Sequence, residues 1–552
     1  MNTSPGVHVV ARVLLAVVGG ALLAAAFPPL GWWWVAPLAV AALTASTVTT
    51  KRTRGAFGLG FLGGATFFLF LLSWIRILGP DAWIALALVC ALWFGLLGVL
   101  TRVLVRLPYW PAWVAGAWIV QEALRDRIPY GGFPWGRLAY SQGDAPTVSF
   151  ASLAGAALVT FVVALAGALL CWAALRLVGW NPPAAIRVPS ESSRAPRLGP
   201  TTSAIGAVLL AIGLCLVGIA IPRPVDGQSE GGAASARVAL IQGSVPGSGL
   251  NAMAERRAVL NNHVRETQRL AAQVVAGEVP APELVIWPEN STDIDPLNDR
   301  AAREAISSAA GAIGVPILVG AVVRSPTTPG TLWNVGIVWD PVTGPGDYYV
   351  KRHPVPFGEY IPGRSVLQRF ISRFDQVPYD FSPGDQPGVL QVGPALLADV
   401  ICFEIAYDDV VRDAVLAGGR AISVQTNNAT YTTDEPGGAA QSEQQAAMSQ
   451  VRAVEHGRAV MIAATSGITA YIDPAGEVVE QAPLLEASSL VVDVPLRDSF
   501  TSADRVGHWP EWLVFLIVIG GVSLSVIRHR RAEPQNLGSG PAGDDDLHDS
   551  DG

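Results

Sequence analysis

Eight long apolar runs constrain the fold of this chain more than any other feature of its sequence. A helix that crosses a bilayer needs about 20 mostly apolar residues. Runs of this kind lie at 9–27, 32–48, 55–78, 83–105, 109–124, 148–176, 203–221 and 510–527. Only 15% of the 552 residues are charged, against about 25% in an average soluble protein. The sequence therefore predicts a polytopic α-helical membrane protein with eight transmembrane helices.

Clusters of Lys and Arg set the expected orientation, because cytoplasmic loops of membrane proteins are enriched in these residues. With both ends of the chain in the cytoplasm, the following residues all lie inside: Lys51, Arg52, Arg54, Arg102, Arg106, Arg187, Arg194, Arg197, Arg528, Arg530 and Arg531. The loop at 125–147 also carries Arg but falls outside, and is an exception. The polar stretch at 222–508 is therefore expected on the extracytoplasmic face.

The chain divides into a membrane part, a soluble part and connecting segments. Residues 1–221 hold seven of the apolar runs, and 510–527 form the last one. Residues 222–236 form a linker rich in Gly, Ser and Ala, and 237–499 form the soluble domain. The acidic residues 532–552 are expected to be a disordered tail.

The soluble domain is predicted to have an α/β fold, because short β-branched runs alternate with helical patterns. Strands are expected at 238–242, 284–287, 316–320, 333–339, 348–351, 398–402, 421–425, 460–464, 469–472 and 490–494. Helices are expected at 253–276, 299–312, 407–417 and 439–457.

Three reactive side chains each stand at the end of an expected strand: Glu289, Lys351 and Cys402. Ligands bind at strand ends in open α/β sheets. A carboxylate, an ammonium and a thiol together suit acyl transfer, as base, oxyanion stabiliser and nucleophile. The thiol is also expected to favour its thiolate form, since it precedes a helix N-terminus. Taken singly, each residue is better explained by an ordinary core, capping or surface position.

Cys402 differs from the other three cysteines in its surroundings. Cys90, Cys171 and Cys215 lie inside apolar runs, where packing explains them. Cys402 is the one thiol of the extracytoplasmic domain, in a compartment where free thiols tend to be oxidised. An unpaired thiol there favours a chemical role.

Spacing and charge argue against two further classes of site. The seven His are scattered and no Cys/His spacing forms a zinc site, so neither a metal nor another cofactor is expected. The net charge of −8 with 37 Lys and Arg argues against a nucleic-acid surface.

Three motifs together resemble the nitrilase, or carbon–nitrogen hydrolase, superfamily. They are Trp287-Pro288-Glu289, the run KRHPVPFGEY at 351–360, and Ile401-Cys402-Phe403-Glu404. The apolar runs, with this domain inserted before the last one, narrow the resemblance to the apolipoprotein N-acyltransferases. Further matches are GFPW at 132–135, YSQ at 140–142, QG at 242–243 and RAVEHGR at 452–458. The resemblance covers residues 9–527.

The resemblance implies a fold and roles for particular residues. The soluble domain would be a nitrilase-like α-β-β-α sandwich. Glu289 matches the general base, Lys351 the oxyanion-stabilising lysine and Cys402 the acylated nucleophile. Glu359 matches a glutamate that supports the lysine, and Glu404 one beside the cysteine.

The resemblance also implies a reaction and its partners. An acyl chain would pass from a membrane phospholipid, through a thioester on the cysteine, to the α-amino group of a diacylglyceryl-modified apolipoprotein. The protein would reside in the plasma membrane of a bacterium, with its catalytic domain extracytoplasmic.

The sequence departs from the family pattern at three places that bear on substrate contacts. Phe403 stands where many members have Tyr, so a hydroxyl is absent there. The segment 244–250 lacks a tryptophan that some members have, and TNNATY at 426–431 replaces a more common Asn-Asp-Ala-Trp-Phe.

Four aromatic residues are possible substrate contacts, each with an equally good alternative. Phe133 and Trp135 could contact substrate or anchor the chain at the membrane interface. Phe370 and Phe374 lie in the apolar segment 363–382, which could form a lid or pack as an ordinary insertion.

Two other functions are open from the sequence. A membrane-tethered nitrilase-like amidase would act without lipid, and would leave the seven preceding runs without a role. A transporter or lipid receptor would place ionisable residues inside the spans. Few are found, namely Arg76, Glu122 and Arg125 near span ends, which weakens transport.

Overall fold

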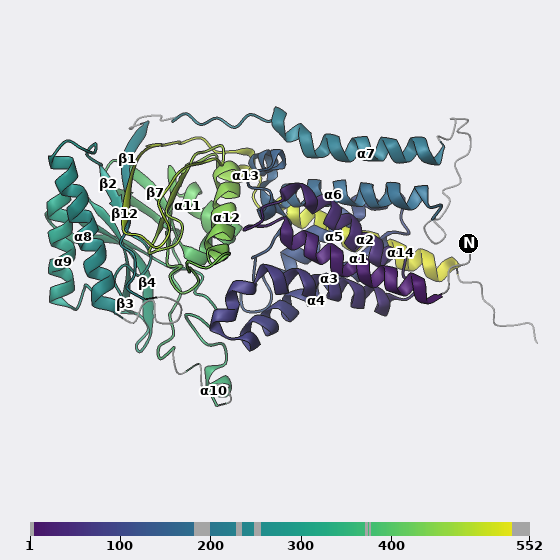
Figure 1. The fold of residues 1–552 in the computed structure, drawn as a ribbon, viewed down its shortest axis with the longest axis horizontal. Helices are drawn as coiled ribbons and strands as arrows, with labels where there is room; N and C mark the ends of the chain where they lie inside the picture. Colours follow the sequence, from purple (N-terminus) through teal and green to yellow (C-terminus); the bar gives the residue numbers. More distant parts are fainter. Residues whose placement is uncertain are drawn as a thin grey trace, which may run out of the picture.

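A computed structural model describes residues 5–180, 199–227, 234–247, 255–369, 374 and 377–532. A helical bundle forms one half of the molecule, and a domain built on two sheets forms the other (Figure 1). Three parts of the predictions lie outside the described residues, namely 533–552 of the expected tail, the linker residues 228–233, and Phe370. Ala532, the first residue of the expected tail, is instead the last residue of a helix.

The bundle contains helices at the positions of the apolar runs. They are α1 (Pro5–Ala25), α2 (Ala36–Val48), α3 (Thr53–Leu71), α4 (Pro80–Leu104), α5 (Trp110–Arg125), α6 (Ala151–Leu177), α7 (Pro200–Leu216) and α14 (Trp509–Ala532). Within the described residues, five segments are long and apolar enough to cross a membrane: Thr53–Leu71, Pro80–Leu104, Pro146–Leu177, Pro200–Ala220 and Trp509–Arg530. The apolar helices Val9–Ala25 and Trp33–Val48 are shorter. The number of eight crossings therefore stays a prediction.

Small residues let α3 and α4 approach closely. A Cβ atom on Gly60 would collide with the carbonyl oxygen of Phe94, and one on Gly98 with that of Ala56. Close backbone approach at small residues is a common way of packing helices inside a membrane. The glycines thus explain why these two helices form one tight pair.

Two six-stranded sheets form the core of the soluble domain. The first has the order β12-β1-β2-β3-β4-β5 and the second the order β11-β10-β9-β8-β7-β6. Strands of the first are β1 (Ser235–Gln242), β2 (Leu284–Ile286), β3 (Ile317–Arg324), β4 (Leu332–Asp340), β5 (Gly344–Val350) and β12 (Ser488–Pro495). Strands of the second are β6 (Val389–Val392), β7 (Ala395–Ile401), β8 (Ala421–Thr426), β9 (Val460–Ala464), β10 (Ala470–Ile472) and β11 (Val478–Gln481).

The layers of the domain follow the expected α-β-β-α order. Helices α8 (Arg256–Val275) and α9 (Arg300–Ile313) pack on the first sheet. Helices α11 (Asp408–Leu416) and α12 (Ala440–His456) pack on the second. Between the sheets, side chains of both form one buried cluster, which includes Leu240, Ile286, Leu397 and Met461. The inner strands are apolar on both faces because each sheet is covered on both sides.

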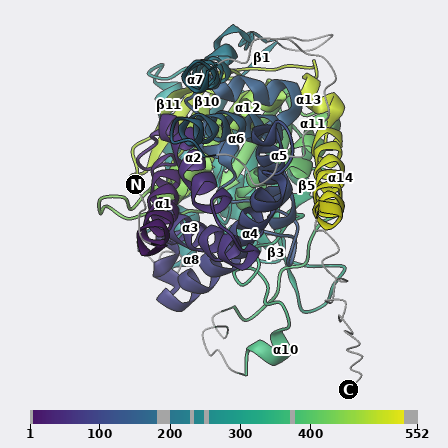
Figure 2. The ribbon, with the colours of Figure 1, turned by 90° about the vertical axis from the view of Figure 1, so that its right-hand side faces the viewer.

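The second helical layer joins the soluble domain to the bundle. Helices α11 and α12 lie between the second sheet and the bundle (Figure 1), and α12 contacts α6. One buried cluster runs from Trp118 of α5 through Tyr140 to Val451 of α12. In contrast, α10 (Arg364–Leu367) projects away from both sheets (Figure 2). The bundle therefore packs against the helical layer formed by α11 and α12, which follow β7 in the chain.

Candidate active site

The two sheets bring Glu289, Lys351 and Cys402 together from three strand ends. Glu289 lies three residues after β2 and Lys351 directly follows β5, both in the first sheet. Cys402 directly follows β7 of the second sheet. Because the sheets face each other, residues far apart in sequence share one site.

Lys351 lies between two carboxylates. Its Nζ donates to Glu289 Oε1 at 2.9 Å and to Glu359 Oε1 at 3.0 Å. Lys351 is 2% exposed and Glu289 is 5% exposed. Burial alone would lower the pKa of Lys351, but Glu289 and Glu359 outweigh it and raise that pKa well above its ordinary value. The lysine is thus held as a fixed cation.

Asn334 joins the same two carboxylates and was not expected from the sequence. Its Nδ2 donates to Glu289 Oε1 at 2.7 Å and to Glu359 Oε1 at 2.8 Å. The backbone N–H of Lys351 donates to Asn334 O at 2.9 Å, so strand pairing sets this position. No local motif marks Asn334, and only the register of β4 against β5 reveals it.

Cys402 occupies a sharp turn at the end of β7. Its φ of 55° is in the left-handed region, which L residues with a side chain rarely adopt. Thr426 Oγ1 donates to its sulfur at 3.2 Å. Cys402 is partly accessible, whereas Glu289 and Lys351 are buried. Of these three residues, Cys402 is therefore the most exposed.

The expectation that a helix N-terminus favours the thiolate is wrong. Cys402 begins a short 3-10 segment, Cys402–Ala406, and α11 starts only at Asp408. Burial, followed by the negative charge of Glu289, raises the pKa of Cys402 to about 12, although Lys351 opposes the shift. The resting group is therefore the thiol.

Glu404 fixes the turn by accepting hydrogen bonds from both sheets. It accepts from Tyr349 Oη at 2.9 Å and from Arg352 N at 2.7 Å, on the side of β5. It also accepts from Ile401 N at 2.8 Å, at the end of β7. Glu404 thus ties the segment that carries Lys351 to the segment that carries Cys402.

Phe403 packs against the bundle. Its ring stacks on those of Phe133, with centroids 5.8 Å apart, and Trp135, with centroids 6.1 Å apart. Trp135 is 2% exposed, and its Nε1 donates to Gln444 Oε1 at 2.7 Å. Phe133 and Trp135, two of the predicted substrate contacts, therefore pack against Phe403, the residue that follows Cys402.

The ring of Phe374 stacks on that of Phe357, with centroids 6.0 Å apart. Phe357 lies between Lys351 and Glu359 in the sequence. Phe357 is 46% exposed. Among the described residues, no group of three or more His, Cys, Asp or Glu could hold a metal ion.

Two families match this chain. Residues 19–169 match the apolipoprotein N-acyltransferase N-terminal domain, and residues 237–499 match carbon-nitrogen hydrolase. The amidase from Nesterenkonia sp. is a similar solved structure, with 20% identity and a TM-score of 0.36. The matched region covers 51% of this chain and 97% of the amidase chain.

Curated relatives match over most of the length. The apolipoprotein N-acyltransferase of Mycolicibacterium smegmatis is 38% identical over 500 residues, which are 89% of this chain and 80% of that protein. The apolipoprotein N-acyltransferase of Pseudomonas putida is 30% identical over 421 residues, 74% of each chain. With this identity over both the bundle and the soluble domain, the chain belongs to the apolipoprotein N-acyltransferase family.

Proposed function

We propose that this protein transfers an acyl chain from a membrane phospholipid to the α-amino group of the N-terminal diacylglyceryl-cysteine of an apolipoprotein. The observation that carries the proposal is the partly exposed Cys402 beside a buried lysine that two carboxylates hold. Membership of the family supplies the acyl acceptor. The helical bundle suits lipid-anchored substrates, which must reach the thiol from the plane of the membrane.

In the first step, Glu289 accepts the proton of Cys402 and the sulfur attacks the ester carbonyl carbon of the phospholipid. Lys351 stabilises the oxyanion together with a backbone N–H near Phe403. Such a donor is worth about 3–4 kcal/mol in other enzymes. The carbon–oxygen bond then breaks, the lysophospholipid oxygen takes the proton from Glu289, and a thioester remains on Cys402.

In the second step, the amino group of the apolipoprotein attacks the thioester carbonyl. Glu289 accepts a proton from the attacking nitrogen and returns it to the departing sulfur, so that an amide and the free thiol result. Each step is a proton transfer coupled to a nucleophilic attack. Neither step requires a metal or another cofactor.

Other residues position these groups. Glu359 and Asn334 hold Lys351 and Glu289 in place through the hydrogen bonds given above. Phe133 and Trp135 support Phe403, which lies next to the nucleophile. Phe374, with Phe357, lies on a partly exposed apolar surface that suits a lid over an acyl chain.

We place the catalytic domain on the extracytoplasmic face of a bacterial plasma membrane. It is joined to the bundle by the linker 222–234, because Ser235 and Ala236 of the expected linker belong to β1. The distribution of Lys and Arg supports this orientation. The acyl donor and the acceptor would both reach the enzyme in the same leaflet.

Product analysis tests the proposal. The full chain in phospholipid nanodiscs is incubated with a diacylglyceryl-cysteine peptide, and the peptide is examined by mass spectrometry. We expect one added acyl chain on its α-amino group, and none with Cys402→Ala. Hydrolysis of small amides without lipid, and no N-acylated peptide, would favour a membrane-tethered amidase instead.

A further inference from the structure

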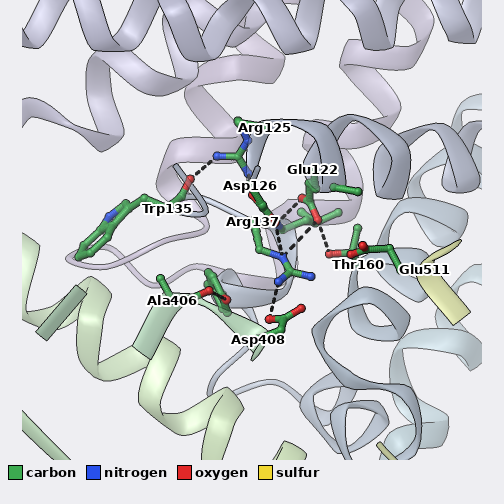
Figure 3. A network of polar contacts seen from close by, with 12 residues as sticks. Glu122, Arg125, Asp126, Trp135, Arg137, Thr160, Ala406, Asp408 and Glu511 are labelled. Atoms are coloured by element: carbon green, nitrogen blue, oxygen red, sulfur yellow. Dashed lines mark hydrogen bonds and ion pairs between the residues drawn. The ribbon is translucent and has the colours of Figure 1, made fainter. Parts of the chain in front are cut away.

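Asp399 of β7 differs from other buried carboxylates of this protein in having no partner. Asp126 and Asp408, for example, both contact the guanidinium group of Arg137 (Figure 3). Asp399 is completely buried, yet neither of its oxygens has a hydrogen-bond partner among the described residues. A buried carboxylate without a partner is costly to ionise. Its protonation state therefore follows from what faces it.

Asp399 faces the space between the two sheets. It lies on the same face of its strand as Leu397 and Ile401, which belong to the buried cluster between the sheets. Gly336 of β4 lies opposite, on the first sheet. A Cβ atom on Gly336 would stand only 2.4 Å from Asp399 Oδ2 and 2.5 Å from Gln425 Oε1. Because Gly336 has no side chain, these two oxygens share one small space.

Two backbone carbonyl groups of the first sheet fix the orientation of the Gln425 amide. Its Nε2 donates to Trp287 O at 2.6 Å and, at a longer distance of 3.4 Å, to Leu318 O. If the amide were turned over, its oxygen would face these two acceptors. Gln425 Oε1 therefore lies on the side of Asp399, and it has no hydrogen-bond partner among the described residues.

Two oxygens that only accept hydrogen bonds repel each other unless a proton lies between them, and a protonated carboxyl group supplies one. Burial raises the pKa of Asp399 well above its ordinary value, the Ser423 hydroxyl lowers it by less, and the negative charge of Glu404 adds to the rise. Tyr349 of β5 also lies nearby, but its hydroxyl donates to Glu404. No cation among the described residues acts on Asp399. It is therefore a neutral acid that can donate to Gln425 Oε1.

Gln425 joins the general base to the sheet that carries the nucleophile. Its amide holds Trp287 O, two residues before Glu289 in the chain. Two residues after Gln425, the backbone N–H of Asn427 donates to Glu289 Oε2 at 2.9 Å. Glu289 is thus held from both sides by one segment of the second sheet, whose strand β7 leads to Cys402.

We propose that protonated Asp399 and Gln425 are positioning residues that hold Glu289 against Cys402. The Asp399 O–H donates to Gln425 Oε1 and so keeps Gln425 Nε2 directed at Trp287 O. A side chain at 399 that cannot donate leaves Gln425 Oε1 buried without a partner, and the amide turns away from Trp287 O. That Glu289 is the base rests on the function proposed above, whereas the proton on Asp399 and the position of Glu289 can be measured without acyl transfer.

Infrared difference spectra test the protonation of Asp399. The full chain and Asp399→Asn are each measured at pH 7 in dodecyl maltoside, which has no carbonyl group. We expect the wild type minus the variant to show the C=O band of a protonated carboxylic acid, which moves to lower frequency after exchange into D2O. Asp493→Asn, which alters a side chain that is 66% exposed, is the matched control and should give carboxylate bands only. Carboxylate bands from Asp399 would overturn the proposal.

The rate of peptide N-acylation measures the effect on the reaction. Asp399→Leu fills the space but cannot donate, and should lower this rate at least about tenfold, because a buried acceptor is left unpaired. Asp399→Asn keeps the shape and has an N–H donor, so it should recover most of the rate that Asp399→Leu loses. Asp493→Asn should leave the rate unchanged. Equal rates for Asp399→Leu and the wild type would be evidence against a positioning role.

Alkylation of Cys402 by iodoacetamide shows whether the effect passes through Glu289. The negative charge of Glu289 raises the pKa of the thiol. Displacement of Glu289 in Asp399→Leu should therefore shift the pH profile of alkylation to lower pH, and Asp399→Asn should not. In a Glu289→Gln background, Asp399→Leu should cause no further shift, because the charge is already absent. A further shift there would indicate general unfolding and would overturn the proposal.

The three measurements separate this proposal from the proposed function. N-acylated peptide without the infrared band or the alkylation shift would overturn the role of Asp399 and leave acyl transfer intact. The band and the shift without N-acylated peptide would support the role of Asp399 in holding Glu289 and overturn the proposed acyl transfer alone.

Discussion

Cys402 keeps its proton at neutral pH, because burial and the neighbouring Glu289 raise the pKa of its thiol to about 12. The two partners of the thiol act on it in opposite directions. The negative charge of Glu289 raises this pKa and the positive charge of Lys351 lowers it. Removing Glu289 should therefore lower the pKa of the thiol, and removing Lys351 should raise it.

Alkylation measures this titration. With iodoacetamide, and the peptide containing Cys402 followed by mass spectrometry, the wild-type rate should still rise with pH at pH 10. Glu289→Gln should shift the profile to lower pH, because a negative charge is removed, although acyl transfer is lost with the base. Lys351→Met should shift it to higher pH. Shifts of the same sign in both variants would contradict the arrangement described here.

The sequence pointed to Glu289, Lys351 and Cys402 because each is a reactive group at a strand end. It could not point to Asn334, because that residue acts through the pairing of β4 with β5 and no local pattern records it. The protonation of Cys402 was also beyond the sequence. It depends on burial and on charges brought from the other sheet.

At the scale of elements, a series of buried and partly buried charges joins the bundle to the segment that follows Cys402. Asp408 lies between Arg137 of the bundle loop and Arg452 of α12. Arg452 also donates to the carbonyl oxygens of Ile405 and Ala406, both at 2.9 Å. Burial would raise the pKa of Asp408, but Arg137 and Arg452 outweigh it and hold that pKa well below its ordinary value.

Arg137→Gln should therefore destabilise the protein and slow acyl transfer. Removing one partner of a buried ion pair lowers the free energy of unfolding by about 3–5 kcal/mol. The exposed pair Arg237–Asp493, with side chains 37% and 66% exposed, provides a matched control. Arg237→Gln should cost less than about 1 kcal/mol. Denaturant unfolding in detergent micelles compares the two, and equal effects would show that the buried series does not hold the domains together.

Some elements were predictable and others were not, for physical reasons. The buried strands and the long amphipathic helices have clear periodic patterns. Strands β6 and β11 lie at opposite edges of the second sheet, where fewer residues are buried. All four residues of β11 are exposed and only two of the four in β6 are buried, so neither strand has a clear apolar pattern. The polar residues of α5 were expected near a membrane interface. Glu122 is instead buried inside the protein, where its carboxylate accepts a hydrogen bond from Leu138 N at 2.7 Å.

At the scale of the whole molecule, orientation in the membrane follows from charge alone and is open to direct test. A reporter fused after Ala236 should report an extracytoplasmic location, and one fused after Arg531 a cytoplasmic location. The reason is the excess of Lys and Arg in the loops assigned to the inside. A cytoplasmic signal from the first fusion would contradict the proposed placement of the catalytic domain.

The central claim is that Cys402 carries the acyl chain as a thioester, and trapping that adduct tests it most directly. The full chain is incubated with labelled phospholipid without acceptor, and the labelled protein is treated with hydroxylamine, which cleaves thioesters. We predict a hydroxylamine-sensitive adduct on the wild type, almost none on Glu289→Gln or Lys351→Met, and none on Cys402→Ala. A hydroxylamine-sensitive adduct that persists in Cys402→Ala would contradict the account.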